Sequence, residues 1–414
     1  MELPQREQPA MTSDVFEANP ELKELFTAAM DEVTDIVARD DGTVFGSESV
    51  RIGAAFRDAG EIRKLRRKQR TCSYPGCTRK AIRASHTIQR SGPLALISEN
   101  RHVFAPHLSL SKKQMSMEKL GIGDASTFSG FCPHHELLFS EFEQRRELSD
   151  ERHIALQVFR TVCREVVRLD SDITSLERSL SSYNQAVSDY GVKHITGKLQ
   201  ASGKLPANFG LRNFSMQGGS RAKTTIEKAL DHLRSMRTRL KNSYFDQALA
   251  DATGRGDGLA HLAINVGQSI PVSLAGFGNF YVQAPSVKEN IYAILNVWPM
   301  PTKTTITLAV PKISDDAANL YINTYARKFL GLVTMIETWM INGTDHWFIR
   351  PSAWKTIPDA RQQQILDDIL DDRFSMGSPY PRSIFDDFRR EAIKLAPTQN
   401  VDASEIEREQ AKLT

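Results

Sequence analysis

Two short-spaced pairs of metal-binding side chains constrain this chain more than any other feature of its sequence. Cys72 and Cys77 flank a Ser-Tyr-Pro-Gly turn, and Cys132 is followed three positions later by His135. Thiolate and imidazole ligands that come as two close pairs are typical of a tetrahedral structural Zn²⁺ site. The alternative is ordinary buried thiols, but free thiols have no reason to cluster with histidine at ligand spacing. We therefore predict one zinc ion held by these four side chains.

The number of cysteines and the hydropathy of the chain indicate its compartment. Four cysteines in 414 residues are too few for a disulfide framework, which favours a reducing cytoplasm. The remaining cysteine, Cys163, follows an apolar helical pattern and is expected in the core. No apolar run has the length of a membrane span, and the first residues lack the form of a signal peptide. We predict a cytoplasmic protein of two or three domains with no membrane partner.

Charge is segregated along the N-terminal part of the chain, although the formal net charge is only +3. Residues 1–60 contain 13 acidic and 5 basic side chains, whereas residues 61–90 contain 10 basic side chains and the single acidic Glu61. Clustered Lys and Arg bind nucleic-acid phosphates by releasing counterions. A solvated helix face is the alternative. Because the basic run leads directly into Cys72, we favour a nucleic acid, in particular DNA, as the partner.

The candidate nucleic-acid contacts all lie in or just after this basic run. They are Arg63, Lys64, Arg66, Arg67, Lys68, Arg70, Arg83 and Arg90.

The middle of the chain is predicted to be helical. Residues 15–40 indicate acidic helices, which can pack as a cap or shield the basic run. Apolar residues recur at steps of three and four over 150–190, which predicts a long helix with a coiled-coil seam. A similar pattern over 226–240 can fold back antiparallel to make a helical hairpin, with a flexible loop at 191–222. The same seam could instead join two copies of the chain as a homodimer.

Residues 251–395 are predicted to form an α+β domain, because short β-branched and aromatic runs there alternate with amphipathic segments. Gly276-Phe277-Gly278 lacks the third glycine of a nucleotide-binding loop, and we expect a turn there. The tryptophans of this half favour core packing, with a receptor surface for a viral protein or small ligand as the alternative. The expected strands are 272–282, 291–297, 304–310 and 346–349, and the expected helices are about 315–341 and 358–371.

Together these patterns predict an α+β fold class with five consecutive parts. The parts are an acidic helical segment (1–60), a zinc-binding module (61–145), a helical hairpin (146–250), an α+β domain (251–395) and a polar tail (396–414).

The segment between the two ligand pairs, Ala81 to Arg90, contains a histidine, His86, that can carry catalysis. The expected order of elements resembles that of the HNH endonucleases, which have the ββα-metal fold. This order is a zinc knuckle, a strand ending in an exposed histidine, a hairpin, and a helix opened by a second ligand pair. The resemblance covers residues 70–142. It implies that His86 is the general base that activates water, that Glu136 holds a catalytic Mg²⁺ or Mn²⁺, and that Asn100 orients the base.

The sequence departs from that family at two places. Ser85 stands where the family has Asp, His or Glu, which weakens a site for a hard cation. Asn100 lies well upstream of Cys132, so an insertion is required. The alternative role of His86 is a structural group that is hydrogen-bonded to a zinc ligand.

The segments that carry the ligand pairs also resemble uncharacterised bacterial proteins of similar length, which are associated with mobile defence islands. The function implied is an HNH-like DNA endonuclease in anti-phage defence, with a phage or defence-system protein as a possible partner. The alternative is a non-catalytic zinc module that binds nucleic acid or a partner protein as a sensor.

Overall fold

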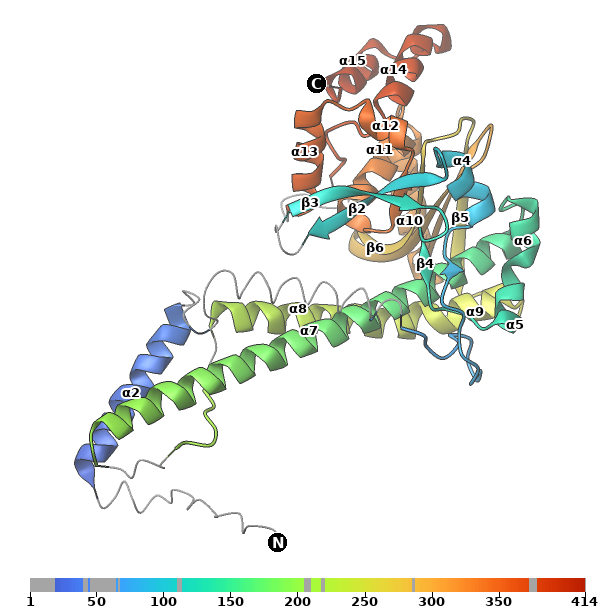
Figure 1. Cartoon of the computed structure of the whole chain (residues 1–414). Helices are drawn as coiled ribbons and strands as arrows, with labels where there is room; N and C mark the ends of the chain where they lie inside the picture. Colours follow the sequence, from blue (N-terminus) through green and yellow to red (C-terminus); the bar gives the residue numbers. More distant parts are fainter. Residues whose placement is uncertain are drawn as a thin grey trace. The chain divides into compact units, whose positions relative to one another are not determined.

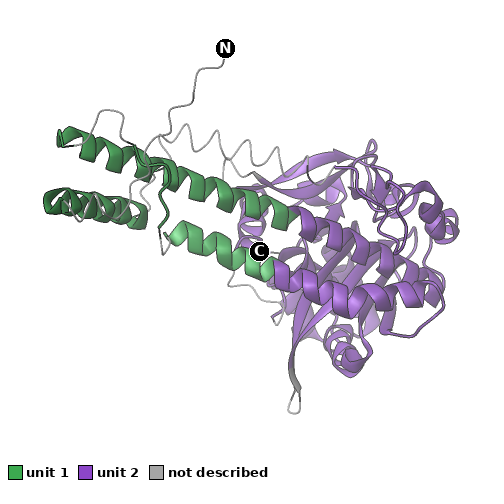
Figure 2. Cartoon of the chain, turned by 90° about the horizontal axis from the view of Figure 1, so that it is seen from below, with its two compact units in different colours: residues 1–58, 172–233 green, residues 59–171, 234–414 purple. Residues whose placement is uncertain are grey.

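The computed structural model describes residues 19–39, 44, 65, 68–109, 114–204, 210–216, 220–284, 287–371 and 378–413. The chain forms two compact units, which Figure 2 distinguishes by colour. Unit 1 comprises residues 1–58 and 172–233, and unit 2 comprises residues 59–171 and 234–414. The chain passes between the units within two helices, α7 (Glu151–Ala201) and α8 (Arg221–Leu240) (Figure 1). Helices and sheet are both present, in agreement with the predicted α+β class.

A seven-stranded antiparallel sheet forms the centre of unit 2, with the strand order β3-β2-β9-β6-β7-β8-β5. Its strands are β2 (His102–Ser109), β3 (Gln114–Gly121), β5 (Leu259–Val266), β6 (Val272–Ala284), β7 (Val287–Pro299), β8 (Thr304–Pro311) and β9 (Trp347–Ile349). A separate two-stranded ribbon pairs β1 (Ser85–His86) with β4 (Thr127–Phe128).

Shorter helices surround the sheet. They are α4 (Ala95–Ile97), α5 (Pro133–Glu136), α6 (Ser140–Arg145), α9 (Asp246–Ala252), α10 (Asp315–Ala326), α11 (Gly331–Thr338), α12 (Pro351–Lys355), α13 (Asp359–Asp368), α14 (Asp386–Leu395) and α15 (Ala403–Ala411). Single turns are η2 (Arg90–Leu94), η3 (Leu137–Phe139), η4 (Lys241–Phe245), η5 (Lys312–Ser314), η6 (Trp339–Gly343) and η7 (Ala396–Gln399).

Strand β7 shows how the sheet separates two layers. Leu295 lies in the main apolar cluster together with Tyr321 of α10. The next residue, Asn296, faces the other side, where its Oδ1 accepts hydrogen bonds from Gln157 Nε2 (3.1 Å) and Thr161 Oγ1 (2.8 Å) of α7. Successive side chains of a strand point to opposite faces. One face of the sheet is therefore covered by the C-terminal helices and the other by the first turns of α7.

The predicted zinc-binding module (61–145) and the predicted α+β domain (251–395) contribute strands to the same sheet. Strand β2 comes from the first part and β9 from the second, and the two pair at Phe104 and Ile349. Ser126 Oγ, beside the ribbon, lies 2.9 Å from Nε2 of the buried His346. Pairing between distant segments leaves no local pattern in a sequence, so periodicity alone could not show this connection.

The strands expected from β-branched runs are present as β6, β7, β8 and β9, and β5 is an additional one. The helix expected over about 315–341 is divided into α10, which ends at Ala326, and α11, which begins at Gly331 directly after Leu330, whose φ is 52°. The helix expected over 358–371 is α13. All four tryptophans are at most 3% exposed, which supports core packing over a receptor surface.

The turn expected at Gly276-Phe277-Gly278 was wrong, because these residues lie inside β6. A Cβ atom on Gly276 would lie 2.2 Å from Thr344 Oγ1, and one on Gly278 would lie 2.7 Å from the Gly343 carbonyl. The glycines therefore allow the end of η6 to approach the strand closely.

Unit 1 is built on the distal part of α7. Helix α2 (Pro20–Arg39) buries Leu22, Val33 and other apolar residues in a cluster with Tyr183 and Val187 of the predicted seam. This part of the seam therefore packs against α2 of the same chain. Helix α7 continues to Ala201, ten residues beyond the start of the loop predicted at 191–222, and α8 begins at its end.

In the described part of the chain, no helix combines the length and the apolar character that crossing a bilayer requires.

The segment predicted as a polar tail (396–414) contains a helix that packs on unit 2. Within it, α15 carries Glu409, which is 3% exposed and pairs with Arg389 of α14. Arg389 is fully buried and also pairs with the fully buried Glu337 of α11, at 2.5 Å. One guanidinium thus neutralises two buried carboxylates and fixes the C-terminal helix to the core.

Replacing Arg389 by Met should destabilise unit 2 by about 3–5 kcal/mol, because it leaves the fully buried Glu337 without its paired cation, whereas Glu409 keeps Lys412 at 2.9 Å. The neighbouring Arg390 is 45% exposed, and Arg390→Met should cost less than about 1 kcal/mol. Urea unfolding followed by tryptophan fluorescence measures both variants, since all four tryptophans lie in unit 2. Equal effects of the two variants would contradict the assignment.

Candidate metal centre and polar site

The first ligand pair is presented by a knuckle at residues 71–80. A bridge between Thr71 and Lys80 closes its base, and the Cys77 N–H donates to the Tyr74 carbonyl (3.1 Å) at its tip. Gly76 adopts φ +75°, a left-handed conformation that suits glycine. The Pro-Gly pair in the sequence therefore forms the tight turn that aims both thiols to one side.

The second ligand pair opens helix α5. Cys132 is the residue before the helix, and its carbonyl accepts from the Glu136 N–H (2.9 Å), so Cys132 and His135 lie one turn apart on the same side. Pro133 occupies the first helical position, where its missing N–H costs nothing. The ring of Tyr74 stacks on the imidazole of His135 at 4.0 Å.

The structure brings the four predicted ligands together. Their ligand atoms lie within 4.8 Å of one another. Sγ of Cys77 and Cys132 are 3.9 Å apart, and Nδ1 of His135 lies 3.4 Å from Cys72 Sγ and 3.5 Å from Cys132 Sγ. Zinc bonds of about 2.3 Å to sulfur and about 2.0 Å to nitrogen give tetrahedral edges of about 3.8 and about 3.5 Å. The cluster could therefore hold a metal ion such as zinc.

The Cys72 thiol needs a cation to ionise in this environment. Burial raises the pKa of the Cys72 thiol to about 11, so the thiolate required for metal binding is costly until a cation is present. Cys163 is also buried, which raises the pKa of its thiol, and it belongs to no cluster of possible metal ligands among the residues described. The expectation that it is a core residue is confirmed.

Purified protein should contain about one zinc ion per chain, and Cys132→Ala should lose this metal and lower the melting temperature. Cys163→Ala removes another buried thiol of the same unit but no ligand, so its metal content should stay at the wild-type value. Elemental analysis with thermal unfolding checks both. Metal retained by Cys132→Ala, or lost by Cys163→Ala, would overturn the ligand set.

His86 lies at the end of β1, next to a group of buried charges. Its Nδ1 is 3.0 Å from the Ala125 carbonyl oxygen, so the proton is on Nδ1 and donates to this carbonyl. Burial lowers the pKa of His86 to about 4, and the positive charges of Arg160 and Arg90 act in the same direction. Because the imidazole is neutral above that pH, Nε2 is left unprotonated and able to accept a proton.

Glu136, the predicted ligand of a catalytic cation, is already fully engaged. One carboxylate oxygen accepts from the guanidinium of Arg160, and the other accepts from Ser85 Oγ at 2.9 Å. Arg160 is 1% exposed and also pairs with Glu143 at 2.6 Å. The Ser85 hydroxyl is buried too and accepts from the Phe131 N–H (3.2 Å). A buried ion pair thus stands where the resemblance implies a metal.

Asn100 is not placed to orient His86. It lies in the turn before β2, with φ 50°, and its carbonyl oxygen is 2.7 Å from His102 Nδ1. In the part of the chain that the structure describes, no hydrogen bond joins Asn100 to His86. The role predicted for Asn100 therefore has no hydrogen bond to support it, and the segment between β1 and β4 is a long insertion that contains β2 and β3.

The predicted nucleic-acid contacts differ in their accessibility. Lys68, Arg83 and Arg90 are exposed. Arg70 is partly buried and directed to α7, where its Nη2 donates to Ser171 Oγ (2.8 Å). The predicted contacts Arg63, Lys64, Arg66 and Arg67 lie outside the described residues. Two exposed cations of the knuckle that the prediction did not include are Arg79 and Lys80.

Sequence reasoning also missed Arg160, the residue that decides the chemistry around Glu136. A signal was present, because Arg160 interrupts a stretch from Ile154 to Cys163 that is mostly apolar. A charge within a buried helix needs a paired carboxylate. The sequence offers many acidic residues as partners, so the pair itself could not be identified.

Comparison of the chain with protein-family models, with curated proteins and with solved structures found no match.

Proposed function

We propose that this chain is an HNH-like endonuclease that binds nucleic acid, in particular DNA, and cleaves it with His86 as the general base. The order of elements supports this proposal. A knuckle with one ligand pair precedes β1, β1 pairs with β4, and α5 follows with the second ligand pair. This order agrees with the ββα arrangement that the resemblance implies, if the cluster holds a structural zinc and the segment between the two strands is an insertion.

The catalytic part of this proposal depends on one observation, the tautomer and protonation state of His86. A general base must be unprotonated at working pH and must present a free lone pair. The hydrogen bond between Nδ1 and the Ala125 carbonyl fixes the tautomer, and the lowered pKa keeps Nε2 free of a proton. Nε2 would take a proton from water while the water oxygen attacks phosphorus and the bond to the leaving sugar oxygen breaks.

The exposed cations near β1 support a nucleic-acid partner. They are Lys68, Arg79, Lys80, Arg83 and Arg90, and they belong to the knuckle, to the segment before β1 or to the turn after it. Side chains of this type neutralise phosphates without reading the base sequence. We expect binding that weakens steeply as salt increases.

The donor set does not fit a catalytic Mg²⁺ or Mn²⁺. Both oxygens of Glu136 are hydrogen-bonded, and Ser85 provides a hydroxyl where a carboxylate or imidazole would be needed. Among the residues described, the zinc cluster is the one group of three or more side chains placed to share a metal. We therefore assign no step to a divalent cation.

A second function, nucleic-acid or partner binding without cleavage, is favoured by that same ion pair. Glu136 is neutralised by Arg160 and cannot also stabilise an additional cation. In this case the zinc module would be a sensor, and His86 would be a structural residue held by the Ala125 carbonyl. For both functions, three proposals are based on the sequence alone. They are the link to anti-phage defence, a protein partner from a phage or a defence system, and a cytoplasmic location.

Cleavage of supercoiled plasmid separates the two functions. His86→Ala should lower the cleavage rate by about 10²-fold or more while the zinc content and the melting temperature stay near wild type. His107→Ala is a matched control, since His107 lies on β2 and its Nδ1 is 3.6 Å from Glu118. Unreduced cutting by His86→Ala would remove the catalytic assignment. Salt-sensitive binding without any product, with or without Mg²⁺ or Mn²⁺, would favour the sensor.

The pH dependence of cleavage tests the state of His86 separately. Protonation abolishes a general base, so the rate should fall on the acid side with the pKa of His86, about 4, rather than near its ordinary value of about 6.5. Initial rates between pH 4 and 8 at constant ionic strength measure this. A rate that already halves near pH 6.5 would contradict the lowered pKa.

A further inference from the structure

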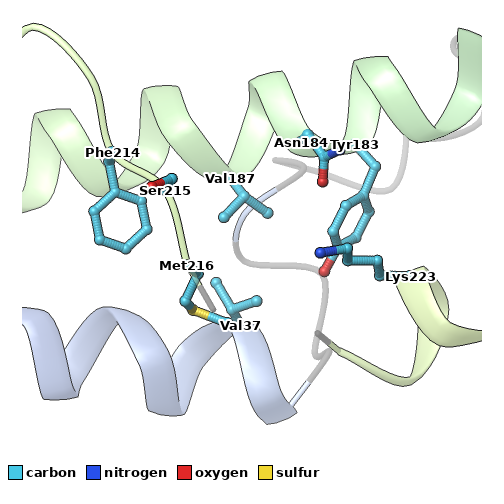
Figure 3. Close-up of a pocket in the computed structure, with 8 residues that line it drawn as sticks. All are labelled: Val37, Tyr183, Asn184, Val187, Phe214, Ser215, Met216 and Lys223. Carbon is cyan, nitrogen blue, oxygen red and sulfur yellow. The ribbon is translucent and has the colours of Figure 1, made fainter. Parts of the chain in front are cut away.

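Unit 1 contains a pocket of about 290 Å³ that no residue of the zinc module lines. Figure 3 shows its walls, which are α7 on one side, α2 on the other, and the segments before and at the start of α8. The lining residues are Val37, Tyr183, Asn184, Val187, Phe214, Ser215, Met216 and Lys223.

One end of the pocket is apolar and firmly built. Phe214 packs on α7 at Gly191, where a Cβ atom would lie 2.4 Å from the phenyl ring. The Phe214 N–H donates to Ser188 Oγ of the same helix (3.3 Å), which holds the segment against α7. Val187 lies between Phe214 and the opposite end (Figure 3), and both are nearly buried. This end suits a small apolar body.

The other end carries a positive charge. Figure 3 shows Lys223 and Tyr183 together there. The Tyr183 hydroxyl is hydrogen-bonded to Ser220, whose Oγ also accepts from the Lys223 N–H (3.3 Å). The Lys223 side chain is 23% exposed, and its charged partner among the described residues is Glu227, at 3.8 Å on the same helix. An ammonium at this distance from its counter-charge gains from a closer anion.

We propose that this pocket binds a small amphipathic anion, a carboxylate with a short apolar tail. The carboxylate would pair with Lys223, and the tail would lie along Val187 toward Phe214. The volume lies at the small end of the range for ligand pockets, which limits the ligand to a compact molecule. This inference is independent of the proposed nuclease, because it uses no residue of the metal centre or of the site at His86.

Octanoate is a suitable probe, because it combines a carboxylate with a flexible apolar tail. Isothermal titration of the full-length chain should give saturable binding with a Kd below about 1 mM. Lys223→Met keeps the length of the side chain and removes its charge, so it should weaken binding by about tenfold or more. Lys228→Met changes an exposed lysine of the same helix and should bind like wild type. Octylamine, with the opposite charge on a similar tail, should not bind.

A second variant tests the apolar end. Val187→Phe fills the space between the charged end and Phe214, so octanoate binding should be lost while Lys223 is retained. Circular dichroism shows whether this variant keeps the helices of unit 1. If wild type does not bind octanoate, or if a folded Lys223→Met or Val187→Phe binds it as tightly as wild type, the assignment is overturned.

Discussion

The convergence of Cys72, Cys77, Cys132 and His135 is the constraint on which the rest of unit 2 depends. It joins a knuckle near the start of the unit to a helix that begins after a long insertion. Next to the ligand cluster, the start and the end of this insertion are joined by a ribbon of two residues per strand, β1 paired with β4. So short a ribbon is marginal on its own. A bound metal would stabilise it by closing the loop at both ends, and His86 lies on that ribbon.

The second determining interaction is the buried pair of Arg160 with Glu136 and Glu143. A guanidinium that is removed from water is stable only with paired carboxylates, so Arg160 requires the ion pairs that it forms with Glu136 and Glu143. Ser85 completes the group with a hydroxyl, and a carboxylate at that position would repel Glu136. Ser85 and Arg160 are thus two parts of one hydrogen-bonded arrangement around Glu136.

The insertion between β1 and β4 connects the candidate site to the C-terminal half. It contributes β2 and β3 to the seven-stranded sheet, and its apolar residues Ile88 and Val103 share a cluster with Ala275 of β6. Gln157 donates to both the Thr87 carbonyl and Asn296, so α7 links the ribbon to the sheet. The C-terminal sheet is therefore connected through Gln157 to Thr87, the residue after His86.

Local patterns in the sequence were sufficient to predict the ligand set, the long helix α7, and most strands of the C-terminal half. Each of these depends on spacing or periodicity over a few residues, such as the pair Cys132 and His135. The joining of β2 to β9, the partner of Arg160 and the position of Asn100 depend on contacts between residues far apart in the chain. Many pairings of that kind are compatible with one pattern of apolar and charged residues. Only packing in three dimensions, where each buried charge must find its partner, selects among them.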